Sequence, residues 1–142
     1  MVERAVVALL AVLIVMGVSY LVRTLARRRV EQVVGTILPS ALVERLHGRA
    51  PAIVYFYGAH CADCRHQAVV LEKLADTYRI AVARVDAASE SGLADTLSVM
   101  TVPSTVLVDA GRRVRAVNLG FRTHDALLAQ VRGLGEAGAN VA

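Results

Sequence analysis

The hydrophobic pattern along this chain begins with one long apolar stretch. From Ala5 to Val22, 18 consecutive residues carry no charge. As a helix, this stretch would reach about 27 Å, which is close to the thickness of a bilayer core. It predicts a single-pass transmembrane anchor over residues 1–22. A cleaved signal peptide is the alternative, because Gly17-Val18-Ser19 offers a small-x-small cleavage pattern, but the apolar stretch continues past it and ends among arginines.

After Pro39 the apolar positions form short runs and helical stripes. The run Pro51–Tyr57 is apolar, β-branched and aromatic, so it predicts a central strand buried on both faces. Spacing over 62–78 predicts a helix whose inward stripe includes Leu71, Leu74 and Tyr78. The other predicted elements are a helix over 40–48, a strand over 80–85, a helix over 89–98, a hairpin pairing 105–108 with 114–117, and a last helix from 123.

This order of elements predicts an α/β fold, with a mixed sheet and helices on both faces. The domain is expected over residues 39–135, followed by a flexible tail over 136–142. In the hairpin turn, Gly111 is expected to take the positive φ.

The net charge of +4 changes the picture once it is located. Most of it lies in residues 1–38, where Arg23, Arg27, Arg28 and Arg29 follow the apolar stretch. We interpret residues 23–38 as a basic juxtamembrane linker that contacts anionic lipid, with a short edge strand over 30–38. The arginine bias favours the cytoplasmic face for the domain, with the outer face as the alternative. Because the excess positive charge lies beside the predicted membrane span, it does not indicate nucleic-acid binding.

Both cysteines lie in Cys61-Ala62-Asp63-Cys64, where the predicted central strand gives way to a helix. A thiol pair in this position can cycle between dithiol and disulfide, because the helix N-terminus stabilises a thiolate and the second thiol can resolve a mixed disulfide. Redox chemistry is therefore the leading functional hypothesis. Thr101-Val102-Pro103-Ser104 follows, with the proline 39 residues after Cys64.

With these motifs in this order, the stretch from about Pro39 to Gly135 resembles the thioredoxin family. The resemblance implies a thiol–disulfide oxidoreductase that acts on protein disulfides and dithiols, exchanges electrons with a reductase or another redox partner, and needs no organic cofactor besides its cysteine pair. It implies that Cys61 is the exposed nucleophile and Cys64 the buried resolving thiol.

The resemblance also implies a substrate-binding loop. Pro103 is expected to be cis, with the Val102 backbone offering hydrogen bonds to an extended substrate segment. Thr101 and His60 are expected to lie beside the same substrate. In this chain His60 stands where thioredoxins usually have a tryptophan.

Three residues are expected to tune the redox pair. Ala62 and Asp63 replace the Gly-Pro that the family's reductases commonly carry, and the Asp63 carboxylate disfavours a thiolate. Tyr55 occupies the position of a buried acid, and we expect it mainly to fill core volume, because a phenol is a poor base at neutral pH. The direction of electron flow stays open.

Two alternative functions use the same cysteine pair or the same fold. A copper or zinc site could draw on His60, Cys61, Cys64 and His66, but four ligands so close in sequence are hard to aim at one tetrahedral centre, so no metal is predicted. A non-catalytic interaction module is the other alternative, although such modules usually lose a cysteine.

Overall fold

The computed structural model describes the backbone of residues 2–139 and the side chains of residues 3–134. Its chain divides between Gln32 and Val33 into two compact units. The first consists of nearly all of helix α1 (Val2–Val33). From Glu3 to Val33 this helix is long and apolar enough to cross a membrane, and a signal sequence can have the same length and composition.

Helix α1 extends further than the sequence predicted. Residues 23–33, expected in a linker, are helical, because arginine, alanine and leucine are good helix formers and no glycine or proline interrupts them. Gly35 then takes a φ of +91°, which ends the helix. The predicted edge strand over 30–38 was wrong: only Ile37 forms a bridge, with Arg113.

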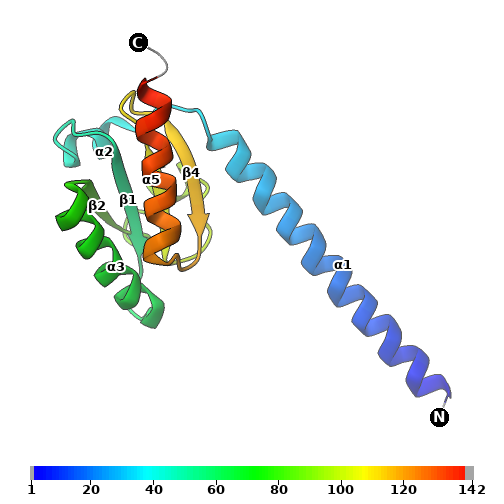
Figure 1. Ribbon diagram of the computed structural model, residues 1–142. Helices are drawn as coiled ribbons and strands as arrows, with labels where there is room; N and C mark the ends of the chain where they lie inside the picture. Colours follow the sequence, from blue (N-terminus) through cyan, green and yellow to red (C-terminus); the bar gives the residue numbers. More distant parts are fainter. Residues whose placement is uncertain (1, 140–142) are drawn as a thin grey trace. The chain divides into compact units, whose positions relative to one another are not determined.

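The second unit is built on a four-stranded mixed sheet (Figure 1) in the order β2-β1-β3-β4. Strand β1 pairs in parallel with β2 and antiparallel with β3, which pairs antiparallel with β4. The expected central strand and hairpin are thus confirmed. The bounds are β1 Ala52–Tyr57, β2 Ala81–Asp86, β3 Ser104–Val108 and β4 Val114–Leu119.

Helices cover both faces of this sheet, as expected, and each face has its own core. Along β1 the side chains alternate: Ile53 and Tyr55 belong to one cluster, Val54 and Phe56 to the other. Helices α3 (Ala62–Tyr78) and α5 (His124–Ala139) contribute to the cluster of Ile53 and Tyr55. Helices α2 (Ser40–Arg45) and α4 (Ser91–Thr96) contribute to the other cluster.

The inward face of α3 differs from the predicted stripe at two positions. Leu71 and Leu74 are buried as expected, but Tyr78 is 40% exposed. Tyr78 lies at the end of the helix, just before Arg79 takes a left-handed conformation, so the sheet no longer covers it. Gln67 is fully buried instead, because both ends of its amide bond the backbone of Arg122, at 2.7 and 3.2 Å.

The hairpin turn places its left-handed residue one position later than expected. Arg112 has a φ of +60°, whereas Gly111 does not take a positive φ. The N–H of Arg112 donates to the carbonyl of Asp109 at 3.0 Å, and the strands shift register between Leu107 and Val108. A turn followed by a left-handed residue at a bulge is a common hairpin geometry, so the prediction for Gly111 was wrong by one residue.

The C-terminal tail was predicted over 136–142. Residues up to Ala139 continue helix α5, and residues 140–142 lie outside the described residues.

Candidate active site

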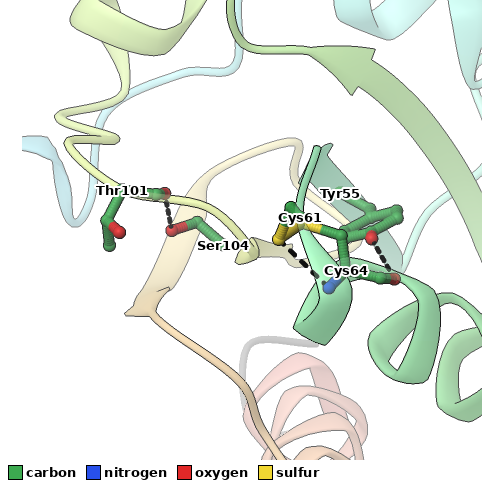
Figure 2. The surroundings of a disulfide bond; sticks show 5 residues. All are labelled: Tyr55, Cys61, Cys64, Thr101 and Ser104. Carbon is green, nitrogen blue, oxygen red and sulfur yellow. Dashed lines mark hydrogen bonds between the residues drawn. A yellow bond between two sulfur atoms is a disulfide. The ribbon is translucent and has the colours of Figure 1, made fainter. Parts of the chain in front are cut away.

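The cysteine pair lies where β1 turns into α3. Cys61 has an extended backbone and N-caps the helix, and its Sγ accepts a hydrogen bond from the Cys64 N–H at 3.1 Å. The two cysteines form a disulfide, with their Cα atoms 5.2 Å apart (Figure 2). A helix N-terminus and an N–H donor aimed at sulfur both favour a thiolate on Cys61 once the disulfide is reduced.

The two sulfur-bearing residues differ in accessibility. Cys61 is partly exposed, whereas Cys64 is buried, with 4% of its surface accessible. Cys64 packs in the α3/α5 core with Leu71 and Tyr55. An incoming sulfur atom therefore reaches Cys61 more easily than Cys64.

The loop containing Pro103 lies beside the cysteine turn. The Val102–Pro103 peptide bond is cis, as expected. A Cβ added to Gly58 would lie 3.2 Å from Val102 Cγ2 and 4.0 Å from Cys61 Cβ, so Gly58 allows the two segments to approach. The carbonyl of Pro103 accepts a 2.8 Å hydrogen bond from Gly120 N–H, which ties the loop to the end of β4.

The remaining predicted site residues are spread around this centre. His60, Ala62 and Asp63 are exposed on the turn that carries the disulfide. Thr101 is also exposed, and its carbonyl accepts a 2.7 Å hydrogen bond from the Ser104 hydroxyl, in a part of the loop apart from the disulfide (Figure 2).

Tyr55 does more than fill volume. Its hydroxyl donates a 2.6 Å hydrogen bond to the carbonyl of Cys64, so it ties β1 to the first turn of α3 (Figure 2). Burial raises the pKa of this phenol, and the nearby positive charge of Arg84 offsets only part of the effect. The hydroxyl is therefore neutral at physiological pH and acts as a donor.

Arg84 is a site residue that the sequence did not identify. It pairs with Tyr55 in the β1–β2 register, and its guanidinium carbon lies 5.8 Å from the Tyr55 ring centroid and 5.7 Å from that of Tyr57. Alternation along β1 and β2 was the available signal, since register partners project to the same face of a sheet.

A cavity of about 630 Å³ adjoins the disulfide and is lined by residues of β1, β2 and α3, Arg84 among them. Among the described residues, no three His, Cys, Asp or Glu side chains form a group that could hold a metal ion, and Cys61 and Cys64 are bonded to each other.

Comparison with known proteins identifies the family of this domain. The thioredoxin family model matches residues 36–133. A thioredoxin from Alicyclobacillus acidocaldarius subsp. acidocaldarius is 26% identical over 98 residues, which is 68% of this chain and 92% of that protein.

Solved structures with a similar fold include a mutant thioredoxin from Halobacterium salinarum NRC-1. It has a TM-score of 0.62 and 25% identity, covering 70% of this chain and 87% of its own. Thioredoxin-2 of the malaria parasite, a component of its protein secretion machinery, has a TM-score of 0.54 and 26% identity, covering 58% of this chain and 81% of its own. Together with the bonded Cys61–Cys64 pair, these matches support thiol–disulfide oxidoreductase chemistry. The chain belongs to the thioredoxin family.

Proposed function

We propose that this protein is a membrane-tethered oxidoreductase that exchanges thiols and disulfides with protein substrates. The observation that carries the proposal is the asymmetry of the pair: Cys61 is accessible at the N-terminus of α3, and its bonding partner Cys64 is buried. Such a pair accepts a substrate sulfur at one position only and resolves the mixed disulfide from inside.

The reductive half-cycle begins with the dithiol form. The Cys61 thiolate attacks a substrate disulfide, forms a mixed disulfide, and releases one substrate thiolate, which takes up a proton. Cys64 then loses its proton and attacks the Cys61 sulfur, which forms the Cys61–Cys64 disulfide and releases the second substrate thiolate. Two electrons pass from the pair to the substrate, and the same steps in reverse oxidise a substrate dithiol.

The local charges act in opposite directions on the Cys61 thiolate. The N-terminus of α3 and the Cys64 N–H stabilise it, whereas the exposed carboxylate of Asp63 destabilises it. A more stable thiolate makes the pair a stronger oxidant, so the reduction potential decides between the two directions.

Substrate recognition is proposed at the Pro103 loop. Its closeness to the cysteine turn supports the proposal, since Val102 Cγ2 would lie 3.2 Å from a Cβ at Gly58. An extended substrate segment would pair with the Val102 backbone, with His60 and Thr101 at its edges. A protein reductase or another thiol compound would exchange electrons with the pair, and no organic cofactor is needed.

Membrane tethering is supported by the apolar helix α1 and the arginines at positions 23–29. We propose a single span, with the arginines and the domain on the cytoplasmic face according to the positive-inside rule. Protease protection of the domain in sealed, oriented vesicles tests this orientation.

The chemistry is tested first by the reduction potential of the pair, measured in glutathione buffers with alkylation of free thiols. A value near about −270 mV marks a reductase and one near about −120 mV an oxidant. Cys64→Ser should trap a mixed disulfide with substrate, and Cys61→Ser, the matched variant, should trap none. If the pair shows no reversible two-electron step, the proposal is wrong.

A further inference from the structure

The cavity beside the disulfide reaches from the cysteine turn to Arg84 on β2. Its lining includes Cys61 and Cys64, and its volume of about 630 Å³ is in the range of small-molecule sites. Val102 and Pro103 are not among the described residues that line it. The disulfide therefore adjoins two different surfaces, the Pro103 loop and this cavity.

The cavity is basic and aromatic. His60, Arg65 and Arg84 contribute basic side chains, Tyr55 and Tyr57 contribute rings, and no acid is present among its described lining residues. The N-terminus of α3 adds a partial positive charge at the same place.

The guanidinium of Arg84 has N–H donors available to bind a ligand. Its guanidinium lies over the rings of Tyr55 and Tyr57, which fixes its place on the cavity wall. Its ion pair with Glu72 is long, at 3.8 Å, and both side chains are more than half exposed, so water screens the attraction. A guanidinium has five N–H donors and binds a carboxylate best through two parallel N–H···O hydrogen bonds.

We propose that this cavity binds a small thiol carrying carboxylates, and that such a thiol supplies the electrons that reduce the Cys61–Cys64 disulfide. The proposal rests on the function proposed above and names its electron donor by chemical class. Protein substrates would use the Pro103 loop, and the small thiol would approach Cys61 from the β2 side. A cavity of this size between α3 and β2 suits a small molecule better than a protein segment.

The proposed reaction consumes two thiols. The first thiolate attacks Cys61 Sγ, the disulfide breaks, and Cys64 leaves as a thiolate that takes up a proton. The second thiolate attacks the small-molecule sulfur of the mixed disulfide, and Cys61 leaves as a thiolate. The products are one small-molecule disulfide and the reduced pair, with two electrons transferred.

The test compares two reductants of the oxidised full-length chain in an uncharged detergent at about 0.15 M salt. Glutathione carries two carboxylates, and its diethyl ester carries none. Each rate of reduction, followed by alkylation of free thiols, is divided by the rate of the same reductant with a small uncharged disulfide, to remove differences in intrinsic reactivity. Glutathione is expected to react about tenfold faster than the ester on this corrected scale.

A double variant tests whether the cavity causes this preference. Arg65→Gln with Arg84→Gln should bring the corrected ratio close to one. Lys73→Gln removes a positive charge from the exposed side of α3, away from the cavity, and should leave the ratio near tenfold. S-Methylglutathione, which has both carboxylates and no free thiol, should inhibit reduction by glutathione competitively.

Equal corrected rates for glutathione and its ester would overturn the proposal, and so would a double variant that keeps the preference, or a lack of inhibition by S-methylglutathione. If dithiothreitol still reduces the pair and protein disulfides still turn over, only this inference fails. If dithiothreitol produces no reversible reduction and no turnover, the function proposed above fails.

Discussion

Replacing Tyr55 with phenylalanine removes one hydroxyl from the contact between β1 and the active-site helix. That hydroxyl is buried and donates a 2.6 Å hydrogen bond to the carbonyl of Cys64. A typical buried hydrogen bond contributes about 1 kcal/mol net. The carbonyl lies inside α3 and keeps its helical acceptor role, so we expect a loss of about 1 kcal/mol in the free energy of unfolding rather than the larger cost of an orphaned group.

The same variant should barely change the redox chemistry. Because burial raises the pKa of Tyr55, its hydroxyl is neutral at pH 7 and contributes no charge to the cysteine pair. Its partner is a backbone carbonyl rather than a sulfur, so we expect the bond in both redox states. The reduction potential should therefore shift by less than about 10 mV.

The assay is guanidinium denaturation of a fragment covering residues 31–142, followed by circular dichroism, together with glutathione equilibration of the same samples. Tyr57→Phe is the matched control, because Tyr57 is the half-buried neighbour whose ring lies 5.9 Å from that of Tyr55. It should cost less than about 0.5 kcal/mol.

Two results would refute this reasoning. A loss equal to that of Tyr57→Phe would mean that the hydrogen bond adds nothing to stability. A potential shift above about 30 mV, which corresponds to about 1.4 kcal/mol, would mean that the Tyr55 hydroxyl affects the two redox states differently.

Three further predictions concern other parts of the chain. Burial opposes ionisation of Asp109, but hydrogen bonds from the Arg113 N–H and from Arg115 hold its pKa below the usual value. The stability that the Asp109 carboxylate contributes is therefore present above about pH 4 and is lost as the pH falls through its folded-state pKa. Asp109→Asn should cost about 1–2 kcal/mol of unfolding free energy, measured in urea, at pH 7 and clearly less at pH 3. Equal costs at the two pH values would contradict this. Gln67→Ala removes a fully buried side chain and breaks its two hydrogen bonds to the backbone of Arg122, so it should cost about 2–3 kcal/mol in urea. A cost below about 1 kcal/mol would show that water replaces the amide. The full-length chain should stay with membranes after an alkaline wash and the fragment 31–142 should not; equal release of both would refute the anchor.

The sequence predicted the elements that have a clear period. Strand β1 and helix α3 lie within a residue of their predicted bounds, because an apolar run and a helical stripe are local signals. The same signals placed the cysteine pair correctly, between the end of β1 and the start of α3. The cis bond before Pro103 was predicted through the family resemblance, while a second one, between Ala50 and Pro51, was not predicted.

The features that escaped prediction depend on distant partners. The burial of Gln67 requires the backbone of Arg122, which lies 55 residues away in the chain. The contact between Tyr55 and the Cys64 carbonyl depends on the angle at which α3 leaves the strand. The basic cavity depends on Arg84 lying across from Tyr55, which requires the β1–β2 register.

The placement of the disulfide in one of the two cores has a consequence for how the protein tolerates repeated turnover. Among the described residues, Cys61 and Cys64 belong to the α3/α5 cluster and not to the α2/α4 cluster, which lies on the other face of the sheet. Opening the disulfide should therefore loosen one layer while the other keeps the register of the strands. In amide hydrogen exchange, reduction should speed the first turns of α3 and leave Leu42, Leu46 and Leu97 as slow as before. The α2/α4 layer would then keep its stability in both redox states. It would hold the sheet in place while the α3/α5 layer repacks after every cycle.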